Sequence, residues 1–565
     1  MQNLSALDAA FLQLETAETP MHLSSVHLLQ LPEGYQGDFP REFMRHVASR
    51  VHLAPMLNRK LAQMPFDLAN PVWIHDDDLD IGYHVRRHNL PAPGSMEQLL
   101  ALCGRLHSNV MDRTRPLWEL VLIEGLNDGD YALFIKVHHS GIDGLSGRVM
   151  VEALFDATPE PRKVPPPPLR PRAAPAGSAE LVAAGLRHAA VQSMQTVRTF
   201  GNLSQLYKAG TQLVEALRGF VSSEGKTEDG GAGKSRGFGA PRLPFNTSVS
   251  NQRLVGVASI PMSDCKAVAK AGGATINDLV LAVASGALRR YLKRRGELPE
   301  RSLVALMPMS LREADDTDMT NRVTMAPCNL HTDIAEPRER LRAISSSTRV
   351  IKERLAQNRA LLITDIPSFG VPWLVSAMVS LAGKLKLADL APVIGNIVIS
   401  NVPTSPVPLY IAGARVLSYW PMLILTHGQG LAMSVHTYAG SMEWGVVGCR
   451  RAVPDAPAIA GDLLASFEAL KQSVLSAPAE AAAAPARTRK PRAAAKPAAA
   501  AEPAAKSRPA AAAEPAAQAR PVAAGRPASK TAAARPRQRA AGKSAAAPRK
   551  TGPRAVRRSK QAAAS

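Results

Sequence analysis

The sequence predicts an α/β fold in two halves, with a helical crossover between them and a disordered tail after them. Strand-like runs of β-branched, aliphatic and aromatic residues alternate with helical patterns in both halves. Between the halves the composition changes first to proline and then to a helical pattern, and the final stretch holds hardly any large apolar residue. We therefore predict four segments: α/β domains at residues 1–156 and 241–476, a linker at residues 157–240, and a disordered basic tail at residues 477–565.

The N-terminal half begins with a strand and ends in a hairpin. We predict strands at residues 22–31, at 119–123 and from 131 onward, and helices at residues 41–51 and 96–110. Both helices carry apolar residues at three- to four-residue spacing. The turn Asn127-Asp128-Gly129 joins the last two strands, so this hairpin leads directly to the segment after residue 138.

The C-terminal half repeats the alternation. We predict strands at residues 253–260, 302–307, 393–400, 414–417 and 431–438, and helices at 275–292, 338–362 and 458–475. Thr275 is a plausible cap for its helix, and Asp278 in the first turn suits the helix dipole. Asn277 has two possible roles, orienting a substrate or loop, or helping to cap the helix, and the capping role is favoured.

The linker has parts of different physical character. The run Pro165–Pro168 and the prolines around it predict a stiff, extended connector. Residues 180–221 have helical apolar spacing with more Arg and Lys than Glu, which is typical of a helix on an anionic lipid surface or of a crossover helix packed on both domains. Residues 224–239 are rich in Gly and charged residues and predict a flexible break.

No segment is predicted to span a membrane. The longest uncharged candidate, residues 366–383, contains two prolines and a glycine, which leave about eleven helical residues where a span needs roughly 20. Residues 373–382, followed by Lys384 and Lys386, fit either a helix in a membrane interface or a buried core helix. The N-terminal sequence lacks a basic segment followed by an apolar core, so we expect no signal peptide.

The cysteines predict neither disulfides nor a zinc site. The four are far apart and include no CxxC pair: Cys103, Cys265, Cys328 and Cys449. This pattern is typical of a reducing compartment. We expect a cytoplasmic protein that associates peripherally with the inner membrane or lipid droplets.

The net charge of +21 is concentrated in the tail. Residues 477–565 contain 20 Lys and Arg against 3 Glu, a net charge of +17, which leaves +4 for the rest of the chain. The tail looks like the Ala-Lys-Pro tails of histone-like and granule-associated proteins, so it is either a nonspecific binder of nucleic acid or another polyanion, or a solubilising appendage. Deletion of residues 477–565 is expected to abolish salt-sensitive retention on immobilised DNA, and unchanged retention would rule out binding by the tail.

The segment Tyr131–Gly147 holds the most informative chemistry. It reads as a strand that delivers His138 and His139 to a glycine-rich turn containing Asp143 and Gly144. Strand alternation places the two histidines on opposite faces, so they should have different roles. An imidazole accepts a proton near neutral pH, so a histidine pair held on a tight corner is typical either of a general base or of a structural pair that holds the fold.

These residues resemble the HHxxxDG motif of CoA-dependent acyltransferases, and the flanking sequence is similar to the bacterial wax ester synthase/acyl-CoA:diacylglycerol acyltransferase family. The resemblance covers roughly residues 1–155 and 240–475. It rests on ordered matches at Leu4–Phe11, Pro20–His22, Asn70–Trp73, Asp112–Trp118, Glu124–Leu126, Thr275–Asp278, Pro308–Arg312 and Ser400–Pro403. It implies a pair of chloramphenicol acetyltransferase-like domains with the active site in a channel between them.

The resemblance also implies the site. His139 is expected to deprotonate the hydroxyl of diacylglycerol or of a long-chain alcohol, which then attacks acyl-CoA, the co-substrate, without an acyl-enzyme. His138 is expected to support the loop, and Asp143 to be architectural and paired with an arginine. The remaining candidates bind substrate: Gly144, Pro116, Leu117, Trp118, Asn277, Ser400 and Asn401. Among these, Asn277, Ser400 and Asn401 are also candidate oxyanion donors, and Trp118 either shapes the pocket or fills the core.

Other readings of the chain remain. No GxSxG elbow is present and no cysteine adjoins the histidines, so a covalent Ser or Cys route has no support. No cofactor or metal is expected, since adjacent strand residues diverge. The alternatives are a related acyltransferase for another lipid or polyketide hydroxyl, and a noncatalytic lipid-granule or nucleoid tether that uses the tail.

Overall fold

The structure is a computed structural model that describes residues 2–62, 70–142, 144–168, 239–310, 323–357 and 372–476. These residues belong to one compact unit, Met1–Ala482. The predicted linker helix at 180–221, most of the Gly-rich break, the end of the helix predicted at 338–362, and the basic tail lie outside the described residues. The predictions for these segments therefore stay predictions.

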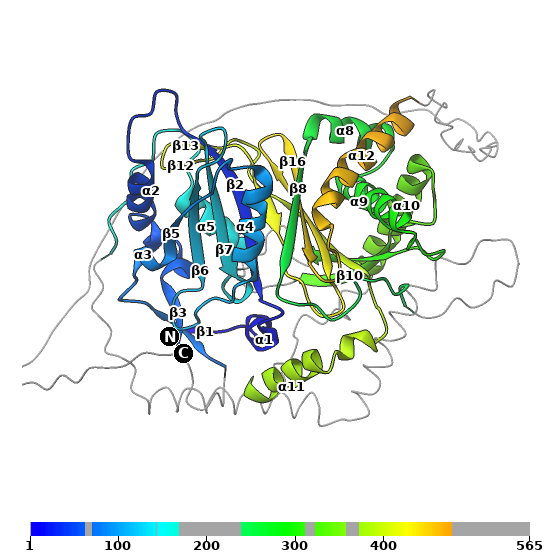
Figure 1. Ribbon diagram of the computed structural model, residues 1–565, viewed down its shortest axis with the longest axis horizontal. Coiled ribbons are helices and arrows are strands. Elements are labelled where there is room, and N and C mark those ends of the chain that lie inside the picture. The colour runs from blue at the N-terminus through cyan, green and yellow to red at the C-terminus, as the bar shows by residue number, and fades with distance from the viewer. Residues whose placement is uncertain are drawn as a thin grey trace, which may run out of the picture. The chain divides into compact units, whose positions relative to one another are not determined.

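The described residues form two large sheets and one small one (Figure 1). The first has the order β12-β13-β2-β7-β6-β5, and β14 also pairs with β2. Its strands are β2 (His22–Gln30), β5 (Val85–Asn89), β6 (Trp118–Glu124), β7 (Tyr131–His138), β12 (Tyr410–Ile411), β13 (Ala414–Val416) and β14 (Trp420–Met422). Its pairs are antiparallel apart from the parallel pair β5 and β6.

The second sheet has the order β10-β9-β11-β15-β16-β8, in which β11 runs parallel to both of its neighbours. Its strands are β8 (Arg253–Pro261), β9 (Val304–Ser310), β10 (Val323–Asn329), β11 (Ile397–Pro403), β15 (Leu431–Tyr438) and β16 (Ser441–Cys449). The small sheet holds β1 (Gln2–Asn3), β3 (Arg59–Ala62) and β4 (Val72–His75).

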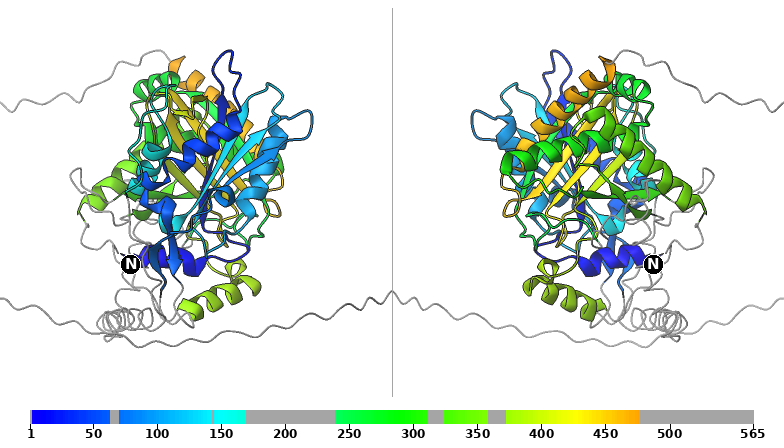
Figure 2. Two further views of the ribbon diagram at one scale, coloured as in Figure 1. Left: turned by 90° about the vertical axis from the view of Figure 1, so that its left-hand side faces the viewer. Right: turned by 90° about the vertical axis from the view of Figure 1, so that its right-hand side faces the viewer.

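Helices flank these sheets (Figures 1 and 2). The α-helices are α1 (Ala6–Leu14), α2 (Phe39–Ala48), α3 (Ile81–His84), α4 (Met96–Ser108), α5 (Gly144–Leu154), α8 (Met262–Ala271), α9 (Ile276–Arg295), α10 (Pro337–Gln357), α11 (Pro372–Lys384) and α12 (Ala456–Leu475). The short 3-10 helices are η1 (Val51–Leu53), η2 (Pro55–Asn58), η4 (His139–Gly141) and η7 (Leu387–Asp389). The α/β class predicted from the pattern is confirmed.

Three strands late in the chain belong to the first sheet. β13 pairs with β2 through Arg415 opposite Gln30, and β14 pairs with β2 through Trp420 opposite Val26. The sequence pattern placed the strand at residues 414–417 in the C-terminal half, but strand pairing between distant segments leaves no mark in local periodicity. The C-terminal half therefore contributes strands to the N-terminal sheet, and one apolar cluster contains buried residues of both halves.

Two glycines let the backbones of neighbouring elements approach closely. In α4, a β-carbon on Gly104 would lie 2.6 Å from the carbonyl oxygen of Arg253 in β8. In β16, a β-carbon on Gly445 would lie 1.6 Å from the carbonyl oxygen of Pro421 in β14. No side chain fits at such separations, so glycine is required at these crossings.

Gly445→Ala is expected to destabilise the protein by about 3 kcal/mol, because β14 and β16 must separate to admit the methyl group. Gly461→Ala is the matched control, since Gly461 lies on the exposed side of α12 with open space around its α-carbon. Alanine favours a helix over glycine by about 1 kcal/mol, so this change should stabilise. Urea unfolding curves of both variants measure the two effects, and a neutral Gly445→Ala would contradict the close crossing.

Candidate active site

The histidine pair lies where β7 ends and η4 begins. The strand alternates as predicted, because Leu133 and Val137 pack in one core cluster while Ala132 and Phe134 pack in the other. β7 ends at His138, and the chain turns at the next residue. The sequence therefore predicted both the strand and the corner.

Backbone hydrogen bonds fix this corner from both sides. The amide of His138 donates to the carbonyl of Leu117 over 3.0 Å, and the amide of His139 donates to the carbonyl of Met21 over 2.8 Å. The segments Asp112–Trp118 and Pro20–His22, which the sequence singled out, therefore hold the two histidines directly. The loop position depends on peptide groups and not on side-chain identity alone.

The ring of His138 is fully buried and its tautomer is fixed. Its Nδ1 accepts the backbone amide of Ser140 over 3.1 Å and lies 2.7 Å from the Ser140 hydroxyl. Because an amide nitrogen only donates, Nδ1 is the acceptor and Nε2 carries the proton. That Nε2 lies 3.2 Å from Oε1 of Glu15. His138 therefore ties the loop to the end of α1, as expected for a supporting residue.

Glu15 is a site residue that the sequence did not reveal. Its Oε2 accepts two hydrogen bonds from Arg113, over 3.1 and 2.7 Å, and its Oε1 accepts the amide of Met21 over 3.1 Å. Burial alone raises the pKa of Glu15, but the imidazole of His138 3.2 Å away, the charge of Arg113 and the Met21 amide outweigh it and hold the pKa at about 2. The carboxylate is therefore ionised and links three segments.

The ring of His139 packs against α1. Its ring stacks on Phe11 of α1, with the centroids 3.9 Å apart and the planes at 16°. The residue is partly exposed, whereas His138 is fully buried. A ring held on one face by an aromatic side chain and at its backbone by Met21 is positioned while part of it stays accessible.

The matches Leu4–Phe11 and Asn70–Trp73 also lie at this loop. Gln13 of α1 donates from Nε2 to Oδ1 of Asn70 over 2.8 Å. A β-carbon on Gly141 would contact the ring of Trp73 at 3.7 Å. Segments that lie up to 130 residues apart thus pack around η4, which local patterns alone did not predict.

Asp143 and Gly144 follow η4 in the chain. Asp143 lies outside the described residues, so its predicted pairing with an arginine stays a prediction. Gly144 is the first residue of α5.

The segment Pro116–Trp118 is buried next to the histidine loop. Pro116 and Leu117 are buried, and Leu117 packs with the apolar side of α1. Trp118 is 1% exposed, donates from its indole nitrogen to the carbonyl of Leu57 over 2.8 Å, and stacks on His84 with centroids 4.4 Å apart. This placement favours the core-filling role of Trp118 over a pocket-shaping one.

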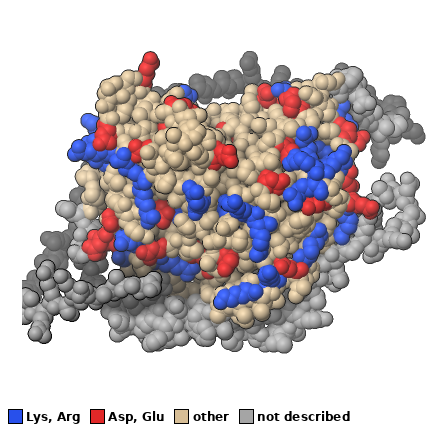
Figure 3. All heavy atoms as spheres, viewed as in Figure 1, with Lys and Arg blue, Asp and Glu red and all other residues tan. Residues whose placement is uncertain are grey.

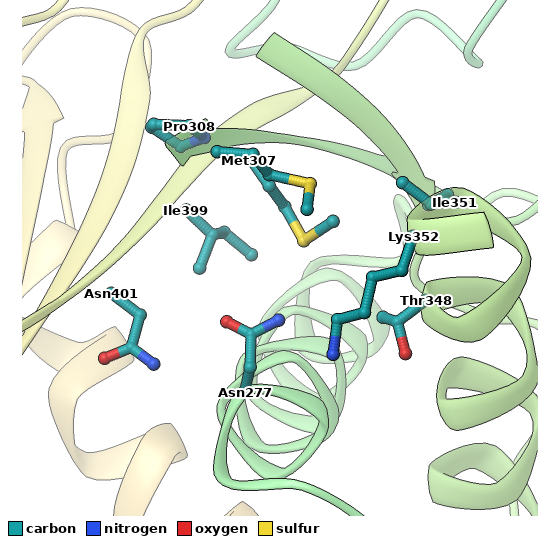
Figure 4. A pocket seen from close by; sticks show the side chains of 9 residues that line it. Asn277, Met307, Pro308, Thr348, Ile351, Lys352, Ile399 and Asn401 are labelled. Atoms are coloured by element: carbon teal, nitrogen blue, oxygen red, sulfur yellow. The ribbon is translucent and has the colours of Figure 1, made fainter. Parts of the chain in front are cut away.

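A separate cavity of about 150 Å³ lies in the C-terminal half (Figure 4). Asn277 reaches it from the start of α9, Asn401 from β11 and Lys352 from α10 (Figure 4). The remaining lining is mostly apolar: Met307, Pro308, Met309, Thr348, Ile351 and Ile399. The three C-terminal segments that the sequence singled out therefore meet here, apart from the histidine loop.

The structure decides between the two roles considered for Asn277. Thr275 and Asp278 form a complete capping box, with Asp278 accepting the Thr275 amide over 2.9 Å. The predicted cap is thus confirmed, and the capping role favoured for Asn277 is wrong because its side chain lines the cavity. Asn401 shares a strand face with Ile399, whereas Ser400 lies on the opposite face of β11 and does not line the cavity.

In the part of the chain that the structure describes, no group of three His, Cys, Asp or Glu side chains could hold a metal ion. The four cysteines, which all lie in the described ranges, are buried and form no disulfide. Across the same described ranges, no single helix is long and apolar enough to cross a bilayer, and α8 with α9 meets the criterion only as a pair bent by 97°.

Comparison with known proteins covers both halves. Residues 4–280 match the model of the wax ester synthase/diacylglycerol acyltransferase catalytic domain, and residues 319–471 match the C-terminal domain of the same family. A probable diacylglycerol O-acyltransferase of Mycobacterium tuberculosis and a putative one of Mycobacterium bovis are each 35% identical over 471 residues, or 83% of this chain and 98% of theirs. The solved wax ester synthase/diacylglycerol acyltransferase from Marinobacter aquaeolei is 29% identical with a TM-score of 0.59, covering 84% of this chain and 100% of that chain.

Proposed function

Because this chain belongs to the wax ester synthase/diacylglycerol acyltransferase family and is an acyltransferase, we propose that it moves a fatty acyl group from acyl-CoA to an oxygen acceptor. The acceptor is diacylglycerol, a long-chain alcohol, or both, and the products are triacylglycerol and wax esters. The observation that carries the proposal is the partly exposed ring of His139, held at the corner after β7. Acyl-CoA is the co-substrate, and no resident cofactor is invoked.

The chemistry assigns the proton transfers to His139. Its ring takes the proton of the acceptor hydroxyl while the oxygen attacks the thioester carbonyl. The new carbon–oxygen bond forms, the carbon–sulfur bond breaks, and the CoA sulfur leaves with the proton that the ring carried. A positioned histidine contributes roughly 10²- to 10⁴-fold to such a step. Neither an acyl-enzyme nor a second nucleophile is needed.

His138 and Glu15 position this base without exchanging protons with substrate. The Nε2 proton of His138 faces the Glu15 carboxylate, and its Nδ1 holds the Ser140 amide. The rigid corner fixes the backbone of His139, and Phe11 fixes its ring. The division of labour predicted for the two histidines thus has a physical basis in their different burial.

The cavity at Asn277 and Asn401 is assigned to binding part of a substrate. About 150 Å³ is a fraction of the 300–1,000 Å³ typical of a drug-sized ligand site, so it holds a segment and not a whole acyl-CoA. Two amides, a lysine and thioether sulfurs suit the pantetheine arm, whose amides alternate with apolar carbons. An oxyanion role for Asn277 or Asn401 remains the alternative.

Asn277→Leu separates these two roles. Loss of one neutral hydrogen bond to a bound arm should raise KM for acyl-CoA about fivefold at nearly constant kcat. Loss of an oxyanion donor should instead lower kcat by about 10²- to 10³-fold. Steady-state kinetics with palmitoyl-CoA gives the split, and Ser400→Ala, on the opposite face of β11, is the control expected to leave both constants unchanged. Unchanged constants in Asn277→Leu would remove the cavity from the reaction.

The acceptor is tested by thiol release from palmitoyl-CoA. Purified protein is supplied with a diacylglycerol, with hexadecanol, with a shorter alcohol, or with no acceptor, and the lipid products are separated by chromatography. We expect acceptor-dependent thiol release together with triacylglycerol or wax ester. Release that needs another hydroxyl would point to the related acyltransferase, and no release with any acceptor would favour the noncatalytic tether.

We also place the enzyme at the cytoplasmic side of the inner membrane or on lipid droplets, bound peripherally. The reason is chemical, because its proposed acceptors reside in lipid. Binding of nucleic acid or another polyanion by residues 477–565 remains a separate proposal that rests on the charge of that segment.

A further inference from the structure

The largest concentration of exposed apolar side chains in the described ranges follows one short segment, α11 and η7. Six of the sixteen large apolar residues that the described part exposes lie here, from 45% exposed at Leu387 to 82% at Leu390. The six are Met378, Leu381, Leu385, Leu387, Leu390 and Ile394. Contiguous patches of this kind mark interaction sites.

The spacing makes these side chains one surface. Met378, Leu381 and Leu385 recur at three and four residues along α11, and the Leu385 amide still donates to the Leu381 carbonyl over 2.8 Å. η7 then carries Leu387, and Leu390 follows directly. In Figures 1 and 2, α11 stands at the edge of the body, next to α1. We call the six side chains the α11 face. The core-helix reading of residues 373–382 is wrong, because α11 presents this face to solvent.

The charges around the α11 face are basic. Lys384 and Lys386 are exposed on either side of Leu385. The nearby acid, Asp389, turns inward and accepts the Thr247 hydroxyl over 2.9 Å and the Ser248 amide over 2.6 Å. In Figure 3, basic side chains interrupt a largely uncharged region at the lower edge, where α11 lies in Figure 1. Leucines flanked by lysines are suited to an interface of acyl chains and anionic headgroups.

On its other side, α11 contacts α1, the helix that packs on the histidine loop. The Ser376 hydroxyl donates to the carbonyl of Gln13 in α1 over 3.1 Å. Two residues earlier in α1, Phe11 stacks on His139. A single helix therefore separates the α11 face from the proposed base.

We propose that the α11 face docks this enzyme on a phospholipid bilayer carrying anionic headgroups. The proposal rests on the proposed function, since diacylglycerol resides in such a layer and the face lies one helix from His139. The leucines enter the acyl-chain boundary, Lys384 and Lys386 contact headgroups, and α11 holds α1 over the membrane. Docking in this orientation delivers a lipid acceptor near the histidine loop.

The test is partition of the full chain onto vesicles of phosphatidylcholine with roughly one third phosphatidylglycerol. About 0.5 M NaCl screens exposed charges beyond ~4 Å, which suppresses binding by the basic tail. The variant L385S/L390S should bind at least about tenfold less than the natural chain, because two leucines lose their apolar contact. The control L464S/L475S removes two exposed leucines from α12, 45% and 47% exposed, and should bind normally.

Equal partition of L385S/L390S and the natural chain would overturn the proposal, as would an equal loss in both double variants. A change from oligomer to monomer by light scattering, with vesicle binding intact, would assign the face to a second copy of this chain and overturn it as well. Thermal unfolding of L385S/L390S should match the natural chain, since both side chains are exposed.

A second assay separates this proposal from the proposed function. With hexanol in vesicle-free buffer, L385S/L390S should release thiol at the natural rate, while transfer to diacylglycerol in vesicles should fall with partition. If the natural chain releases no thiol with any acceptor, the proposed function fails, and vesicle partition still decides on the α11 face. Equal rates with vesicle-borne diacylglycerol in both proteins would show that docking by this face is not used for the acceptor.

Discussion

His139→Ala is expected to lower the turnover of palmitoyl-CoA with diacylglycerol or hexadecanol by roughly 10²- to 10⁴-fold, the contribution of a positioned general base. The fold should survive, because the ring is partly exposed and its stack on Phe11 is worth about 1 kcal/mol. Acceptor-dependent thiol release measures the loss, and thermal unfolding checks that the variant is folded.

Two other histidines make the comparison specific. His88→Ala changes an exposed histidine of β5 and should leave turnover and stability unchanged. His138→Ala should retain more activity per folded molecule than His139→Ala but should lose stability, since it leaves the Glu15 carboxylate without its imidazole partner. Equal activity losses in the two variants, with equal stability, would contradict the separate roles of the adjacent histidines.

The sequence predicted those parts of the fold that local periodicity encodes. The alternating faces of β7 and the corner after His138 follow from the apolar pattern and from Gly141, and the cap at Thr275 follows from its distance to Asp278. These features depend on neighbours a few residues apart. The predicted boundaries of such elements agree with the structure within a few residues.

Features that depend on distant segments were missed. β16 contains Gly445 and Gly448, which weaken a strand pattern, yet close contacts with Pro421 and Ala456 make glycine necessary at both positions. The pairing of β14 with β2 joins segments that lie about 400 residues apart. Neither arrangement can be predicted from a local sequence pattern.

The candidate site likewise has parts that local patterns predict and parts that only the fold brings together. His138 and His139 stand in a recognisable motif, but Glu15 is a lone acidic residue just after a helix, and only the fold brings it to Arg113, 98 residues away. The sequence did select Arg113 within Asp112–Trp118 and Phe11 within Leu4–Phe11. A prediction that those two segments contact the histidine motif in the fold is the signal that could have identified Glu15.

Glu15→Gln is expected to destabilise the protein at pH 7 by about 3 kcal/mol. The change leaves Arg113 and the His138 proton facing an amide instead of a carboxylate, and removal of one partner from a buried pair costs about 3–5 kcal/mol. The lower end applies because the Arg113 side chain is 34% exposed and regains hydration. Urea unfolding measures the difference, and Glu18→Gln, at an exposed acid three residues on, should be neutral.

The pH dependence identifies the charge as the cause. The pKa of Glu15 is about 2 in the folded protein against 4.5 ordinarily, so the unfolded chain binds the extra proton between these values. The stability that Glu15 adds is therefore complete above about pH 4.5 and disappears as the pH falls towards 2. The difference in unfolding free energy between the natural protein and Glu15→Gln should narrow across that window.

A difference that stays constant from pH 7 down to pH 3 would mean that the carboxylate acts by shape and not by charge. The double variant Glu15→Gln/Arg113→Leu should then recover none of the lost stability. If charge is the cause, removing both partners should recover part of the stability, because no arginine remains without its carboxylate partner.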